Sequence, residues 1–137
     1  MTSLAEFLFP VPARRSVPGI LAWWERRRLA YNVFVGTSGL VSLAVFTTLQ
    51  ALPPFSSPVI PPWQVVVIYG VGANVLYTLG SVVEIAAEKL WRGELLPIGP
   101  ALYRMGLTFA VGLTLFPALL ISIVWVIAIV ASVAVGI

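Results

Sequence analysis

Residues 63–92, WQVVVIYGVGANVLYTLGSVVEIAAEKLWR, decide the fold class of this chain, and residues 63–83 within them carry no charge. About 20 apolar residues, rising about 1.5 Å each, cross a hydrocarbon core roughly 30 Å thick, so the stretch predicts a membrane-spanning helix. Its small and polar residues recur every seven positions, as in the row Gly70, Tyr77 and Glu84. Bulky apolar residues fill the other positions. The pattern predicts a helix with one face against protein and the other against lipid.

The composition places the chain among integral membrane proteins and excludes several functions. Hydrophobic residues make up 60% of the 137 residues and charged residues 9%, with a mean hydropathy of +1.03, whereas soluble domains carry about 25% charged residues. The chain has no Cys and no His, which removes the commonest metal and haem ligands and the commonest general base. We therefore expect a single membrane domain that is not an enzyme, with no cofactor and no metal site.

Residues 1–28 are predicted to form a cytoplasmic or interfacial arm. Ser16 and Pro18 are typical of a helix start, and the tryptophans of WWERRR favour the bilayer surface. Arg26, Arg27 and Arg28 point about 100° apart on a helix, so they form a collar suited to lipid phosphates. The partner predicted for this collar is anionic lipid at the cytoplasmic face. A simple topological stop signal is the alternative.

The first span is predicted over residues 29–51, where the small residues of GTSGLVS offer a surface for close helix contact. Five prolines in the loop of residues 52–62 end this helix. The second span covers residues 63–83 and continues as helix to about residue 92. Residues 93–99 make a cytoplasmic turn, which gives an all-α bundle of three transmembrane helices.

The third helix is predicted over residues 100–137 and is unusually long. From Met105 to the end, 33 residues carry no charge, and one straight helix of that length extends roughly 50 Å. Either Pro117 kinks this helix or its end projects beyond the membrane. Ala128, Ser132 and Gly136 recur every four residues in the last segment, which predicts a contact with a partner helix.

The basic residues predict the orientation. Five arginines precede the first span, and Lys89, Arg92 and Arg104 lie between the second and third spans, so all eight basic residues fall on one side. The positive-inside rule then places the N-terminus in the cytoplasm and the C-terminus outside a bacterial inner membrane. Because these charges flank spans, the net charge of +3 indicates no nucleic-acid partner.

The candidate site residues of the second helix are interpreted as helix-packing or partner contacts. They are Gly70, Asn74, Tyr77, Ser81 and Glu84. Asn74 lies near mid-membrane and is expected to bond to a Ser or Thr hydroxyl of another helix or subunit. Glu84 lies at the cytoplasmic boundary, where pairing with Arg104 or the arginine collar is expected. Contact with a ligand, pigment or ion is the alternative for both.

The pairing of WWERRRLAYN before the first span with GANVLYTLG in the second resembles a group of small bacterial membrane proteins. The resemblance covers two short patches. It implies a bacterial membrane location and brings no activity or functional residues with it.

The sequence therefore predicts an accessory or scaffolding subunit of a larger inner-membrane complex, such as a respiratory or photosynthetic one. Its expected partners are other integral membrane subunits, because three helices cannot bury this much apolar surface among themselves. The alternative is a small homo-oligomeric transporter or channel component in which Asn74, Tyr77, Ser81 and Glu84 line a path.

Overall fold

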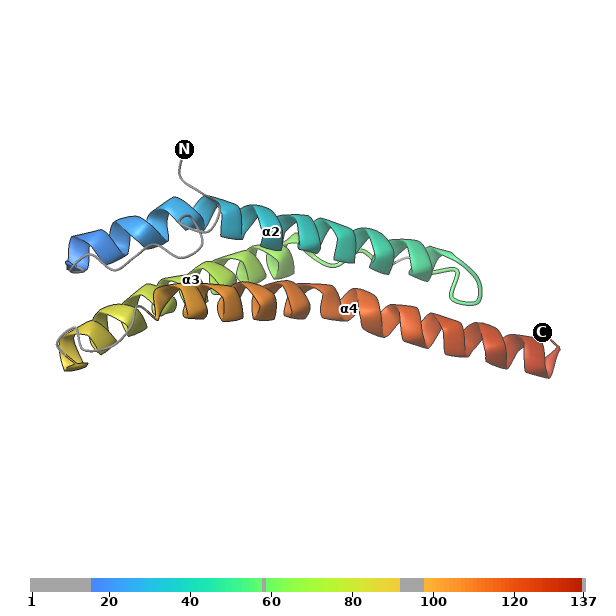
Figure 1. Ribbon diagram of the computed structural model, residues 1–137. Coiled ribbons are helices and arrows are strands. Elements are labelled where there is room, and N and C mark those ends of the chain that lie inside the picture. The colour runs from blue at the N-terminus through green and yellow to red at the C-terminus, as the bar shows by residue number, and fades with distance from the viewer. Residues whose placement is uncertain (1–15, 58, 92–97, 137) are drawn as a thin grey trace, which may run out of the picture.

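The computed structural model describes residues 16–57, 59–91 and 98–136, and this part of the chain forms three helices (Figure 1). They are α2 (Val17–Ala51), α3 (Trp63–Trp91) and α4 (Gly99–Val135). All three are long and apolar enough to cross a membrane. The prediction of an all-α chain with three such helices is confirmed. Most of the predicted arm and turn, residues 1–15 and 92–97, lies outside the described residues.

The three helices alternate in direction, so that α2 and α4 run parallel and α3 runs antiparallel to both (Figure 1). The starts of α2 and α4 and the end of α3 therefore lie at one end of the bundle. We call this the basic end, because the described basic residues of all three helices, from Arg26 to Arg104, lie toward it.

Local sequence explains where α2 begins and ends. The Ser16 hydroxyl accepts a hydrogen bond from the Gly19 N–H at 3.3 Å, and a proline occupies the first turn. Both features satisfy or remove N–H groups that have no partner inside the helix. The arginine segment and the charge-free segment of residues 29–51 thus belong to one continuous helix, which stops before Pro53 and Pro54.

The most extensive helix contact joins α2 to α4. Ala110, Thr114 and Ala118, spaced four apart on α4, are buried, and so is Ser42 on α2. A Cβ built on Gly39 would lie 3.6 Å from the Thr114 methyl group. The small residues of the GTSGLVS segment in α2 therefore face this row of small residues in α4, which lets two long helices pack closely without a large apolar core.

α3 covers only part of the length of the other two helices. The hydroxyls of Tyr69 and Thr114 share a hydrogen bond, so these two residues lie at the same level of the bundle. Trp63, the first residue of α3, is six residues before Tyr69, so α3 begins about 9 Å past this level, toward the end of α4. Farther along, the Trp125 indole donates to the Pro53 carbonyl at 2.9 Å. This bond ties the loop after α2 to α4 and leaves the last ten residues of α4 beyond it.

α4 continues through Pro117 as one helix (Figure 1) and ends at Gly136. Gly136 adopts a φ of 73°, and its N–H bonds to the carbonyls of Ser132 and Val133. A left-handed residue at this position closes a helix, and glycine adopts it without steric cost. Gly136 therefore has a backbone role in addition to the partner contact predicted for it.

Candidate functional site

An aromatic cluster joins all three helices near the basic end. Its members are Trp23, Trp24 and Tyr31 from α2, Tyr77 from α3 and Tyr103 from α4. The rings of Trp24 and Tyr77 meet edge to face with centroids 5.1 Å apart, and those of Tyr31 and Tyr77 lie 4.6 Å apart. Such pairs contribute about 0.5–1.5 kcal/mol each beyond the area they bury. The cluster holds the three helices together at this end.

The Glu84 carboxylate lies against this cluster and is only 3% exposed. The Trp24 indole N–H donates to its Oε2 at 2.6 Å. The carboxylate also lies beside Gly99, the first residue of α4. The N-cap residue of α4, Ile98, makes no side-chain hydrogen bond to the first turn of the helix. A negative charge is stabilised at a helix N-terminus. The pairing of Glu84 with Arg104 or the arginine collar stays a prediction. The structure places a tryptophan donor and a helix terminus beside the carboxylate.

Two glycines make this arrangement possible. A Cβ on Gly80 would lie 2.6 Å from a ring carbon of Trp24, and a Cβ on Gly99 would overlap the Glu84 carboxylate. Real Cβ atoms do not approach other atoms this closely. The indole therefore packs on bare α3 backbone, and the carboxylate packs on bare α4 backbone.

Three tyrosine hydroxyls donate hydrogen bonds across helix boundaries to backbone carbonyls. The pairs are Tyr31 with Ala73, Tyr77 with Trp24 and Tyr69 with Ala110, with oxygen–oxygen distances of 3.2, 2.5 and 3.3 Å. Buried hydroxyls require such partners. Each bond also fixes the register of one helix against another.

The three arginines of the predicted collar have different surroundings. Arg26 is exposed. Arg27 lies over the Trp23 ring, with its guanidinium carbon 3.9 Å from the ring centroid. Arg28 binds the Glu25 carboxylate through two nitrogens at 2.9 and 2.7 Å, and this hydrogen bonding lowers the pKa of Glu25, which precedes the charge-free segment. The collar is thus partly engaged within the protein, and lipid-phosphate contact remains a prediction.

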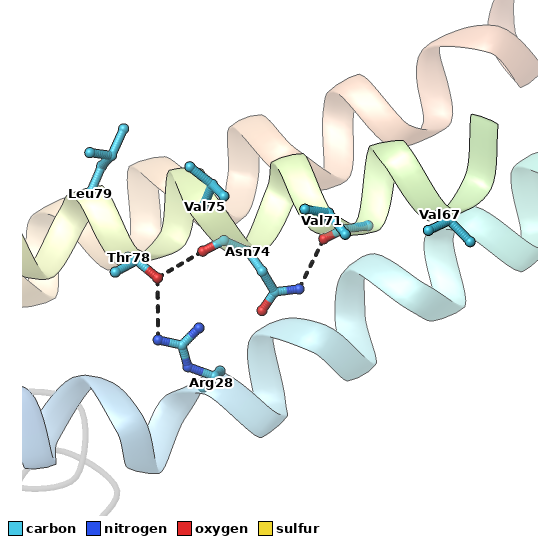
Figure 2. A pocket seen from close by; sticks show the side chains of 8 residues that line it. Arg28, Val67, Val71, Asn74, Val75, Thr78 and Leu79 are labelled. Carbon is cyan, nitrogen blue, oxygen red and sulfur yellow. Dashed lines mark hydrogen bonds between the residues drawn. The ribbon is translucent and has the colours of Figure 1, made fainter. Parts of the chain in front are cut away.

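A shallow groove of about 680 Å³ runs along α3 beside α2 (Figure 2). Arg28 reaches across it and donates to the Thr78 hydroxyl at 3.3 Å. The Asn74 amide donates to the Asn32 side-chain oxygen and to the Gly70 carbonyl, each at 3.0 Å. The sequence predicts a hydroxyl partner for Asn74, but the observed partner on α2 is another amide. Valines and Leu79 complete the lining.

A second, narrower cleft of about 410 Å³ separates α3 from α4. Its apolar lining includes Leu76, Phe109 and Leu113, together with Gly72 and Gly106. Neither glycine has an atom within 4 Å of the position of a Cβ. Because glycine has no side chain, Gly72 on α3 and Gly106 on α4 leave this space open.

The other predicted site residues are distributed over the bundle. Ser81 is buried and donates to the Thr78 carbonyl of its own helix. Gly70 has open space at its Cβ position, so no helix among the described residues approaches it closely, and contact with a partner chain stays a prediction. Ala128 and Ser132 lie half-buried on the last turns of α4. The structure therefore brings Tyr77, Ser81 and Glu84 into the bundle interior and leaves Gly70 beside an open groove.

Trp24, Asn32 and Gly99 take part in the site but were not predicted to do so. The sequence marks Trp24 only as a surface aromatic, and Asn32 and Gly99 stand outside any repeat. Gly80 had a signal, because it lies seven residues from both Ala73 and Ala87. The Trp24 ring packs on Gly80, and Ala73 and Ala87 of the same row are also buried.

Among the residues that the structure describes, no group of three His, Cys, Asp or Glu is placed to hold a metal ion. No protein-family model, curated protein or solved structure matches the chain.

Proposed function

We propose that this chain is an accessory subunit of a larger bacterial inner-membrane complex, such as a respiratory or photosynthetic one, which it stabilises by helix packing. In this proposal all three helices cross the membrane. The basic end faces the cytoplasm, as the positive-inside rule requires, and the C-terminus lies outside.

The observation that carries the proposal is the end of α4. Ten residues follow Trp125 in this helix, extending about 15 Å. Their only polar side chain, Ser132, donates to the Ile129 carbonyl of its own helix at 2.8 Å, and Ile127 and Val133 are 62% and 75% exposed. An apolar surface of this extent usually marks an interaction site.

Residues that would line a transport path are engaged inside the protomer, which favours the accessory role over the transporter. Tyr77, Ser81 and Glu84 are at most 5% exposed. Tyr77 and Ser81 donate to backbone carbonyls, and Glu84 accepts from Trp24. Of the four residues, Asn74 borders the shallow groove beside α2 and Tyr77 borders the cleft between α3 and α4.

The test is purification of the tagged chain in native-lipid nanodiscs, followed by mass spectrometry of what accompanies it. We expect foreign membrane subunits at fixed stoichiometry. A chain truncated after Trp125 should insert with unchanged topology but lose those subunits. Ala128→Leu should weaken the association, whereas Ala44→Leu, which adds the same bulk at an exposed position of α2 outside this surface, serves as its control.

Two outcomes contradict the proposal. A pure homo-oligomer in native lipid supports the transporter instead. Retention of every partner by the truncated chain shows that lipid covers the end of α4. The orientation is tested separately with a reporter that is active only outside the cytoplasm, which should function at Ile137 and fail at Thr2.

A further inference from the structure

We infer that the groove between α2 and α3 is a binding site for one anionic phospholipid, with its phosphate at Arg28 and an acyl chain along α3. The inference rests on the membrane placement in the proposed function but not on the accessory role. It assigns one defined lipid site where the sequence predicts only a general collar.

The polar groups of the groove gather at one end. Figure 2 shows the Arg28 guanidinium reaching from α2 toward α3, with Thr78 opposite it and Asn74 one turn farther along. Arg28 uses Nε and Nη2 for its bonds to Glu25 and Thr78, and its Nη1 makes no hydrogen bond to any residue that the structure describes. Guanidinium groups have five N–H donors and suit phosphate oxygens. Donors for a phosphate are therefore present at this end.

The charge at this end favours an anion. Arg28 already binds Glu25, but Arg26 and Arg27 precede it directly, so the segment of residues 25–28 has a net charge of +2. A cluster of basic residues beside a membrane-spanning segment attracts anionic headgroups. A zwitterionic lipid offers the same phosphate with a compensating positive charge, so it should bind more weakly.

The rest of the groove is apolar and has the length of one leaflet. Val75, Val71 and Val67 follow one another along α3 away from Arg28 (Figure 2). From Thr78 to Val67 the helix rises about 16 Å, close to half of a hydrocarbon core roughly 30 Å thick. Because Leu29 begins the charge-free segment directly after Arg28, a phosphate at Arg28 lies at headgroup depth and its chain enters the groove. This depth places Asn74, four residues from Thr78, about 6 Å below the headgroups, shallower than the mid-membrane position expected from the sequence.

Gly70 provides a way to close the groove without disturbing the bundle. It lines the groove, and a Cβ there would meet no atom within 4 Å. Gly70→Leu should fill the space that the acyl chain occupies. Gly112→Leu is the matched control, because Gly112 is also an open helical glycine and does not line the groove.

The experiment is native mass spectrometry of the full chain in detergent micelles, titrated with phosphatidylglycerol and, separately, with phosphatidylcholine. We expect one phosphatidylglycerol to bind about tenfold more tightly than phosphatidylcholine. Gly70→Leu and Arg28→Gln should each weaken its binding about tenfold, or about 1.4 kcal/mol. Gly112→Leu and Lys89→Gln, which match them in bulk and in charge and lie outside the groove, should leave it within about twofold.

Equal losses for Arg28→Gln and Lys89→Gln overturn the inference in favour of general attraction to the basic end. Unchanged binding in Gly70→Leu overturns the placement of the acyl chain. Circular dichroism and thermal unfolding of each variant establish that it is folded, and Gly70→Leu keeps the test decisive if Arg28→Gln is unstable. Release of the wild-type chain from membranes by alkaline carbonate would refute the membrane placement in the proposed function. A chain that stays inserted but binds both lipids equally would refute only the lipid site.

Discussion

The indole N–H of Trp24 donates to the buried carboxylate of Glu84, 60 residues away on a different helix. A hydrogen bond to a charged group contributes about 1.5–3 kcal/mol, so Trp24→Phe should lower the free energy of unfolding in detergent micelles by about that amount. The double variant Trp24→Phe/Glu84→Gln should cost less than the sum of the two single variants, because the charge that needs the donor is gone. Strict additivity would show that the bond contributes nothing to stability.

Gly80 and Gly72 form a matched pair on α3. A Cβ at Gly80 would lie 2.6 Å from the Trp24 ring, whereas Gly72 has open space. We expect Gly80→Ala to destabilise the bundle by about 1–3 kcal/mol through overpacking, and Gly72→Ala to be neutral or to stabilise it by up to about 1 kcal/mol through helix propensity. Thermal unfolding of the two variants side by side checks this. Equal effects would mean that the Trp24 ring does not lie on Gly80.

Asn74 and Asn32 should behave as one unit. Asn74→Leu and Asn32→Leu each remove the same interhelical bond, at an expected cost of about 1 kcal/mol. The double variant should cost little more than either single one, and unfolding in mixed micelles measures the coupling. A variant at Asn74 that assembles normally but abolishes an ion or solute flux would instead favour the transporter.

Gly99 should tolerate a side chain only when the neighbouring carboxylate is absent. Because a Cβ there would overlap Glu84, we expect Gly99→Ala to destabilise the protein by about 1–3 kcal/mol. In a Glu84→Ala background the same substitution should cost less than about 0.5 kcal/mol. An equal penalty in both backgrounds, measured by unfolding, would contradict the contact.

The sequence was sufficient for the helices because their limits depend on local chemistry. Charge-free runs, the prolines of residues 52–62 and the Ser16 cap are each read from a few neighbouring residues. The small residues of the GTSGLVS segment also indicated a close helix contact, and the structure packs this part of α2 against Thr114 of α4. Local signals thus determine the elements and the surfaces that face protein.

The site was less accessible because its contacts join distant segments. Tryptophan near a membrane boundary favours the interface by type, yet Trp24 is only 3% exposed. Its burial depends on Gly80, which no property of α2 reveals. Likewise, the partner of Asn74 is an Asn at the start of the first span rather than a hydroxyl. Which polar groups meet depends on helix register, and register follows from the whole set of packing contacts.

The unequal lengths and offsets of the helices give the molecule a taper. Near Tyr103 a plane across the bundle cuts three helices, whereas beyond the bond between Trp125 and Pro53 only α4 continues among the described residues (Figure 1). Tyr69 lies level with Thr114, so Thr78 and the headgroup at Arg28 lie level with about Met105 on α4. About 30 Å of hydrocarbon measured from there ends near Trp125, so a bilayer in the proposed orientation encloses all three helices and leaves the last turns of α4 outside it. A chain without its partner must then expose an apolar helix to water.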